Sequence, residues 1–285
     1  MSTNVLRTAD GWWAVRGERA VPVRTEAATT AELIADRAAV KEAAASGKQG
    51  TPVADLAALS PVTTPCRVVA QMVNYRSHAR DSGFTGDIPP AFFRKASGSV
   101  SGPADAIVRP AHVALLDYEV ELGLVMGAPL PVGTVVGEPD LPSYVAGLVV
   151  TDDVSARDVQ LTRTQFYESK SYPTFTPTGP HLALLEPEDF AHLLDLRLRL
   201  SVNGELRQDR TLGTAAWASL LHTTRSPRPP GNPAESLAGN PVGSLAGNPV
   251  ENSAGNSAGN PVENSAENPT VNPAVNNPLP RSTTP

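Results

Sequence analysis

The stretch Asp117-Tyr118-Glu119-Val120-Glu121-Leu122 is decisive for this chain, because acidic residues occupy alternate positions in it. A strand sends every second side chain to one face, so Asp117, Glu119 and Glu121 are expected to point the same way. Like charges placed together raise each other's pKa unless a cation lies among them. The pattern therefore indicates either a site for a hard divalent ion (Mg²⁺, Mn²⁺ or Ca²⁺) or a solvated face whose acids meet nearby Lys or Arg.

A second acidic segment follows the apolar run 144–150. It reads Thr151-Asp152-Asp153-Val154-Ser155-Ala156-Arg157-Asp158 and adds carboxylates directly after an expected strand. A cluster that offers only oxygen ligands suits a hard cation better than a soft one. The spacing of the two segments leaves both interpretations open, a metal site and a solvated face.

Length, charge and cysteine content restrict the class of protein. The chain has 285 residues, a net charge of -6 and a pI near 5.4, which argues against a nucleic-acid partner and favours a small molecule. The single Cys66 excludes an internal disulfide, agrees with a reducing compartment and is interpreted as a buried apolar residue. Residues 1–10 lack the apolar core of a secretory signal, and no stretch approaches the ~18 apolar residues of a membrane helix. We therefore expect a soluble cytoplasmic protein with no membrane partner.

Apolar periodicity divides the chain into a leading module (1–62), a main domain (63–212) and a tail (213–285). In the module, the capping box that joins Thr29 to Glu32 is expected to begin a helix reaching Ala45. The predicted strands are 11–17, 20–23, 68–73, 107–108, 119–126, 145–151 and 196–202, with a short helix at 189–195. Asn203-Gly204 predicts a hairpin after the last strand. This order favours a sheet-rich α+β fold over alternating βαβ units.

The tail differs from the rest of the chain in composition. The unit Ser-Leu-Ala-Gly-Asn-Pro-Val recurs at Ser236 and Ser244, and the segment 226–285 contains no aromatic residue and no Lys. Such a segment buries too little apolar area to offset the entropy of ordering, so we expect it to be disordered. A solenoid of short period is the weaker alternative.

His78 and Asp81 form another candidate pair, three residues apart. On one helical turn the carboxylate would orient the imidazole for general-base catalysis. An isolated pair of this kind is also typical of a surface contact, so the spacing leaves both interpretations open.

Taken in order, several motifs resemble those of the fumarylacetoacetate hydrolase family. The matching pieces are Asn74-Tyr75-x-x-His78, Phe93-x-Lys95, Gly102-Pro103, Asp117-Tyr118-Glu119-x-Glu121-Leu122, Asp153-x-Ser155-Ala156-Arg157-Asp158-x-Gln160, Lys170 and Gly179-Pro180. The match runs from about Val68 to Gln208 and is far more specific than one motif alone.

The resemblance implies a β-roll and a metal-dependent hydrolase or lyase of C–C bonds in small β-diketo or 2-oxo acids, of the acylpyruvate or fumarylacetoacetate type. Glu119, Glu121 and Asp153 correspond to the metal ligands, and Mg²⁺ is the usual ion. Asp152 is outside this pattern, and strand alternation is expected to aim it away from Asp153. Decarboxylases and isomerases in the family use the same enolate stabilisation, so they remain alternatives.

The resemblance also implies roles for other residues. His78 and Asp81 resemble a dyad that activates water, and Lys170 completes the catalytic set. The substrate-binding positions correspond to Tyr75, Lys95, Arg157 and Gln160. A homodimer is implied if the fold closes.

The chain departs from the family pattern after Gln208. The expected Gly-Asp turn, Thr-Gly-Thr-Pro loop and closing strands are replaced by a segment that runs into the Asn-Pro repeat. We therefore expect a fold that is incomplete at its C-terminal end. An inactive remnant that only binds a metal or a ligand, and a tail that binds a partner, are the competing hypotheses.

Overall fold

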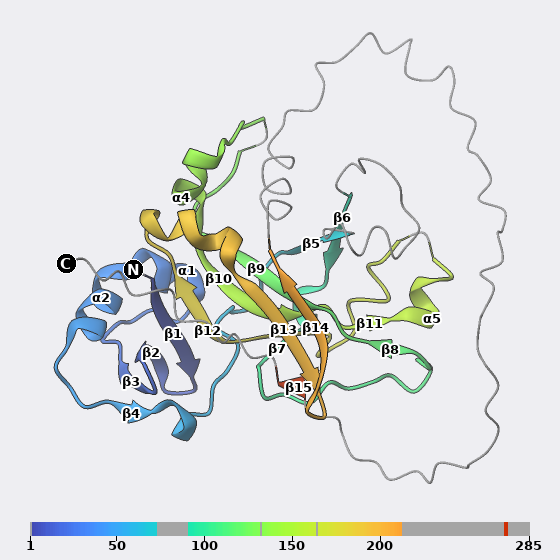
Figure 1. The fold of residues 1–285 in the computed structure, drawn as a ribbon, viewed down its shortest axis with the longest axis horizontal. Coiled ribbons are helices and arrows are strands. Elements are labelled where there is room, and N and C mark those ends of the chain that lie inside the picture. The colour runs from blue at the N-terminus through green and yellow to red at the C-terminus, as the bar shows by residue number, and fades with distance from the viewer. Residues whose placement is uncertain (1, 73–90, 132, 164, 213–270, 273–285) are drawn as a thin grey trace.

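The computed structural model describes residues 2–72, 91–131, 133–163, 165–212 and 271–272, and strands dominate it (Figure 1). Along its largest sheet the strands follow the order β4-β3-β2-β1-β12-β10-β9, with β7 paired to β12 beside that path. These strands are β1 (Thr3–Thr8), β2 (Gly11–Arg16), β3 (Arg19–Pro22), β4 (Thr51–Pro52), β7 (Val100–Ser101), β9 (Val120–Met126), β10 (Val145–Asp152) and β12 (Thr176–Leu184). The predicted sheet-rich α+β class is confirmed.

The leading segment joins this sheet through β1, which pairs antiparallel with β12. Its helices α1 (Thr30–Ala35) and α2 (Arg37–Ala45) lie beside β1 and β2 at one end of the molecule (Figure 1). Apolar side chains of both helices and of the sheet share one core: Val5, Trp12, Val21, Leu33, Val40, Leu182 and Leu184. The predicted boundary near residue 62 stays a prediction, and the sheet runs across it.

The capping box at Thr29 is confirmed, but the helix that follows is interrupted. Thr29 accepts the amide of Glu32, and Glu32 accepts the amide of Thr29. Asp36 then leaves helical geometry at φ -101 and ψ 45, and its carboxylate accepts the Thr25 hydroxyl at 2.6 Å. The expected helix is confirmed as far as Ala45, with a break at Asp36, whose side chain bonds outside the helix.

The predicted hairpin at Asn203-Gly204 is confirmed. It joins β13 (Arg197–Val202) to β14 (Glu205–Thr211), with φ 52 at Asn203 and 80 at Gly204, as a tight turn of this type requires. Leu198 and Leu200 face inward and pack with Val120 of β9. A short strand, β15 (Val271–Asn272), pairs with the other edge of β13.

Two further small sheets complete the main region. One pairs β5 (Val68–Met72) with β6 (Ala91–Lys95), and the other pairs β8 (Leu116–Asp117) with β11 (Ser155–Ala156). The predicted strand at 107–108 was wrong: Val108 is 60% exposed, and its amide donates to the Thr174 hydroxyl instead of a strand neighbour. The helix expected at 189–195 is a 3₁₀-helix over Pro187–Asp195.

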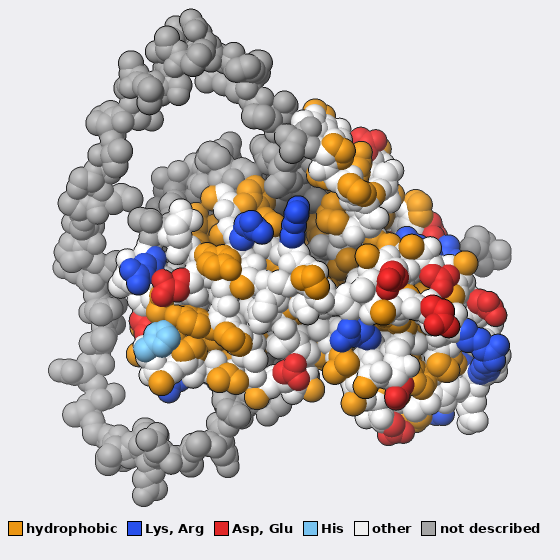
Figure 2. Space-filling view, turned by 180° about the vertical axis from the view of Figure 1, so that it is seen from behind, with side chains coloured by type: hydrophobic (Ala, Val, Ile, Leu, Met, Phe, Trp, Pro, Cys, Tyr) orange, Lys and Arg blue, Asp and Glu red, His pale blue; other side chains and the backbone are white. Residues whose placement is uncertain are grey.

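The remaining observations concern surface charge, membrane-spanning helices and the tail. Basic side chains are scattered on the face shown in Figure 2, and acidic ones gather over the leading segment. In the ranges that the structure covers, no helix is long and apolar enough to cross a membrane. Apart from β15, the tail lies outside the described residues, so its disorder stays a prediction.

Candidate active site

Glu119 lies in the gap between β8 and β9, where the strand predicted to begin at this residue has not yet started. Two consecutive residues hold its backbone: Asp152, the last residue of β10, and Asp153, which follows it. The Asp153 amide donates to the Glu119 carbonyl at 2.8 Å, and the Glu119 amide donates to Asp152 Oδ1 at 2.8 Å. These bonds bring the segments carrying Glu119 and Asp153 side by side.

Lys170 lies between these two carboxylates. Its ammonium donates to Glu119 Oε2 at 2.7 Å and, over a shorter distance, to Asp153 Oδ2. The ammonium also lies 5.0 Å from the centre of the Phe93 ring. Because the Lys170 side chain is only 4% exposed, this cation is enclosed among its partners rather than solvated.

Lys95 is the second buried cation of the cluster. Its ammonium donates to Asp153 Oδ1 at 2.5 Å and to the Phe175 carbonyl at 2.7 Å. Burial lowers the pKa of Lys95, and Asp153 opposes this effect. Asp153 is therefore flanked by an ammonium group at each of its oxygens.

Arg157, at the start of α5 (Arg157–Gln160), closes the exposed side of the cluster. Its Nε donates to Asp117 and its Nη2 to Glu119, each at 2.8 Å, while Nη1 donates to Gln160 Oε1 at 2.7 Å. The guanidinium thus spans two acids in the fork geometry for which Arg is suited.

The carboxyl groups of the cluster differ in pKa. Burial raises the pKa of Glu119, but Lys170 and Arg157 outweigh it and the pKa falls to about 2. For Glu121, burial and then the charges of Glu119 and Asp153 raise the pKa to about 8. Burial likewise raises the pKa of Asp152 to about 6. Glu121 is therefore an acid whose charge the neighbouring cations do not compensate.

The donor set fits a hard divalent cation, although the arrangement of the side chains does not. Glu119, Glu121 and Asp153 supply three carboxylates from adjacent segments, and burial together with the charges of the other two raises the pKa of Glu121. Within the described ranges, however, no three His, Cys, Asp or Glu side chains are arranged to hold a metal ion. The Lys170 ammonium lies between two of them, so an ion would have to displace it.

The structure brings together most of the residues predicted for the site. Lys95, Glu119, Asp153, Arg157, Gln160 and Lys170 form one hydrogen-bonded network, which Glu121 joins electrostatically. Tyr75, His78 and Asp81 lie outside the described residues, so their roles stay predictions. Sequence reasoning missed the contacts of Asp152 and of the Phe175 carbonyl. The apolar run before Asp152 was the signal that this acid would be buried.

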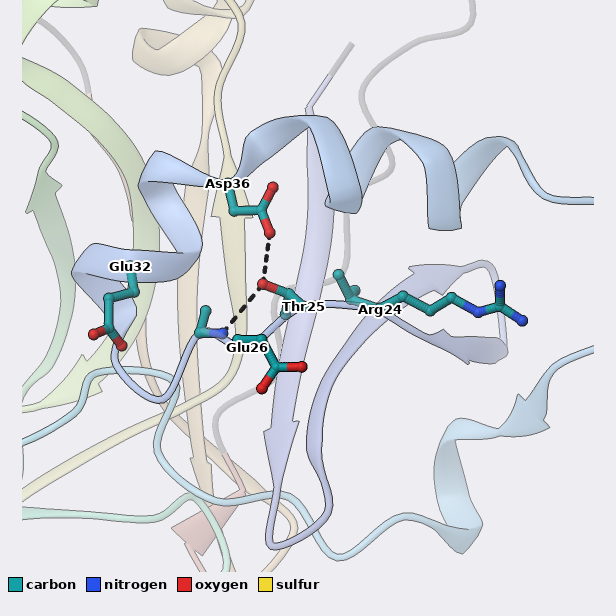
Figure 3. Close-up of a pocket in the computed structure, with 7 residues that line it drawn as sticks. Arg24, Thr25, Glu26, Glu32 and Asp36 are labelled. Carbon is teal, nitrogen blue, oxygen red and sulfur yellow. Dashed lines mark hydrogen bonds between the residues drawn. The ribbon is translucent and has the colours of Figure 1, made fainter.

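Two other features lie apart from the network. Cys66 is half-buried, not buried as expected, because it lies in the segment before β5, where its amide donates to the Ser97 hydroxyl. A groove in the leading segment is lined by Val23, Arg24, Thr25, Glu26, Ala27, Glu32 and Asp36 (Figure 3). Several of its polar groups are used in the helix cap and in the Thr25–Asp36 bond, which favours a structural role.

Comparison with known proteins identifies the family. The model of the fumarylacetoacetate (FAA) hydrolase C-terminal domain matches residues 67–220, more than half of the chain. The chain therefore belongs to the fumarylacetoacetate hydrolase family, and the resemblance found in the motifs is confirmed.

Relatives differ in the reactions that their names describe. The bovine mitochondrial oxaloacetate tautomerase FAHD2B is 36% identical over 171 residues, which are 59% of this chain and 53% of that protein. The 2,4-didehydro-3-deoxy-L-rhamnonate hydrolase of Sphingomonas sp. is 38% identical over 149 residues, or 52% of this chain and 50% of that protein. This chain spans about half the length of the curated relatives it matches.

Among solved structures, a probable 2-hydroxyhepta-2,4-diene-1,7-dioate isomerase from Mycobacterium abscessus has the same fold. It aligns with a TM-score of 0.63 and 29% identity, covering 79% of this chain and 82% of that one. Members with this fold thus include tautomerases, isomerases and hydrolases of small keto acids.

Proposed function

We propose that this chain catalyses enolate chemistry on a small 2-oxo or β-diketo acid, with Mg²⁺ or a similar ion held by Glu119, Glu121 and Asp153 after it displaces the Lys170 ammonium from two of them. The observation that carries the proposal is that Glu119 and Asp153 meet at the Lys170 ammonium, with Glu121 close by, in the region that the family model matches. Three acids that repel one another in the absence of an ion form a strong site when one is present. The proposal includes the tautomerase and isomerase outcomes as well as C–C cleavage.

The bound ion would supply Lewis-acid polarisation of the substrate's oxygens. Arg157 offers a planar fork for the substrate carboxylate, and its present partners Asp117 and Glu119 show that it reaches the cluster edge. Lys170, once released from Glu119 and Asp153, would donate to the developing oxyanion. Lys95 contacts the Asp153 carboxylate and holds it in place.

Hydrolysis and tautomerisation make different demands on the same site. Cleavage of a C–C bond needs a water activated by a base, and we assign His78, held by Asp81, to that role. Tautomerisation needs no attacking water, only the removal of a proton from the carbon beside the carbonyl and the delivery of a proton to its oxygen, or the reverse. The named relatives support either outcome. His78→Ala distinguishes the two reactions. It should abolish hydrolysis of an acylpyruvate, whereas tautomerase activity should remain if another group transfers the proton.

The first test measures metal binding and turnover together. Millimolar Mg²⁺ should raise the melting temperature of the full chain by mass action, and Glu121→Gln should abolish the rise. Glu138→Gln, which changes an exposed acid, is the matched control and should keep it. Oxaloacetate tautomerisation and acylpyruvate hydrolysis are then followed with Mg²⁺ and with chelator.

The outcomes discriminate between the hypotheses. A Mg²⁺-dependent rise with turnover supports the enzyme, and a rise without turnover of any 2-oxo acid supports the inactive remnant. The metal site is refuted if Mg²⁺ leaves the melting temperature unchanged and a chelator leaves turnover unchanged. Whether the chain forms a homodimer and is cytoplasmic stays a prediction.

A further inference from the structure

Asp152 is an unusual residue, because it is a buried acid that the family's motif leaves without a role. The residue is 2% exposed and ends β10. One carboxylate oxygen, Oδ1, accepts the Glu119 amide, and the other, Oδ2, is buried with no hydrogen-bond partner among the residues that the structure describes. Burying an acid with an unpartnered oxygen costs free energy, so this position calls for a functional explanation.

The hydrogen bond from the Glu119 amide to Asp152 lies at the end of the β9–β10 pairing, and this position suggests its function. Asp152 is in register with Val120, the first residue of β9, so the Glu119 amide lies just beyond the end of the ladder. A strand neighbour's carbonyl would normally accept such an amide. Here the Asp152 carboxylate takes that place, and the backbone of Glu119 can leave strand geometry without losing its hydrogen bond.

A second hydrogen bond, from the Asp153 amide, also holds the backbone of Glu119. The Asp153 amide donates to the Glu119 carbonyl, so both backbone groups of Glu119 are held by two consecutive residues. Fixing the backbone on both sides restricts where the Glu119 carboxylate can lie relative to that of Asp153.

From this geometry we infer that Asp152 is a positioning residue, which fixes Glu119 opposite Asp153 by accepting its backbone amide. The expected effect on metal affinity rests on the proposed function. The hydrogen bond by which Asp152 fixes the Glu119 backbone does not depend on it. Groups that orient a metal ligand typically change metal affinity by about 10- to 100-fold when they are removed.

The test uses the full chain with Asp152→Ala and Asp152→Asn. Asn keeps an oxygen that can accept the Glu119 amide, whereas Ala keeps none. Hydrogen exchange at the Glu119 amide, measured without metal, should be as slow in Asp152→Asn as in the wild type and about tenfold faster or more in Asp152→Ala. If Asp152→Ala does not fold, Asp152→Ser replaces it, because its hydroxyl is too short to reach.

Asp189→Ala is the matched control. Asp189 is also a buried acid, 4% exposed, and it accepts the Glu186 amide at 2.9 Å away from the cluster. Its loss removes the same kind of bond from another part of the fold. Glu119 exchange should therefore stay at the wild-type rate in Asp189→Ala, whatever the change in overall stability.

The second readout is the Mn²⁺ dissociation constant, measured by calorimetry. We expect it to rise about tenfold or more in Asp152→Ala and to stay within about threefold of the wild type in Asp152→Asn and Asp189→Ala. Unchanged Glu119 exchange in Asp152→Ala overturns the inference, and so does an Asn variant that binds Mn²⁺ as poorly as the Ala variant. If the wild type binds no Mn²⁺, the proposed function fails, and Glu119 exchange by itself decides whether Asp152 positions this residue.

Discussion

Glu121→Gln should remove a pH-dependent loss of stability from the metal-free protein. The folded-state pKa of Glu121 is about 8, against an ordinary value of 4.5. The folded protein therefore holds this proton where the unfolded chain has released it. Stability from this group is fully present below pH 4.5 and is lost as the pH rises through about 8.

The size of the effect follows from the linkage relation. Each pH unit between the two pKa values costs the folded wild type about 1.4 kcal/mol, so a rise from about pH 5 to about pH 7 costs about 2–3 kcal/mol. Gln carries no titratable proton. The stability of Glu121→Gln relative to the wild type should therefore increase by about this amount over the same interval.

Urea unfolding in the presence of a chelator, at several pH values, measures this difference. Glu138→Gln is the control, because it makes the same change at an exposed position outside the cluster. The reasoning is refuted if Glu121→Gln and the wild type also differ by a constant amount from about pH 5 to about pH 7.

Three further changes test the network and the fold. Lys170→Met should destabilise the metal-free protein by about 3–5 kcal/mol in urea unfolding, because Glu119 and Asp153 lose the cation between them, and Mg²⁺ should restore part of the loss. Arg157→Lys keeps the charge but loses the fork, so KM for a 2-oxo acid should rise about tenfold with a smaller change in kcat. Thr29→Ala removes a helix cap and should lower the free energy of unfolding by about 1 kcal/mol, without affecting turnover.

Contrary results would be informative in each case. A Lys170→Met protein as stable as the wild type would mean that the two carboxylates are hydrated and not buried. An unchanged KM for Arg157→Lys would place the substrate carboxylate elsewhere, and turnover lost in Thr29→Ala would connect the leading segment to the site.

Local patterns were read correctly from the sequence where the interactions themselves are local. The capping box at Thr29 and the turn at Asn203-Gly204 each depend on neighbouring residues and their backbone angles. The prediction at 107–108 was wrong because two apolar residues carry no periodicity, and the Thr174 hydroxyl, far along the chain, takes the amide of Val108.

The sequence by itself determined the family, the order of the acidic and basic motifs, and the strands that carry Glu121 and precede Asp153. Only the tertiary structure decided the position of Lys170 between Glu119 and Asp153, the raised pKa of Glu121 and the hydrogen bond from the Glu119 amide to Asp152. The physical reason is that side-chain alternation is a property of one strand. Burial and charge pairing instead depend on segments that are distant in sequence and meet only when the sheet has formed.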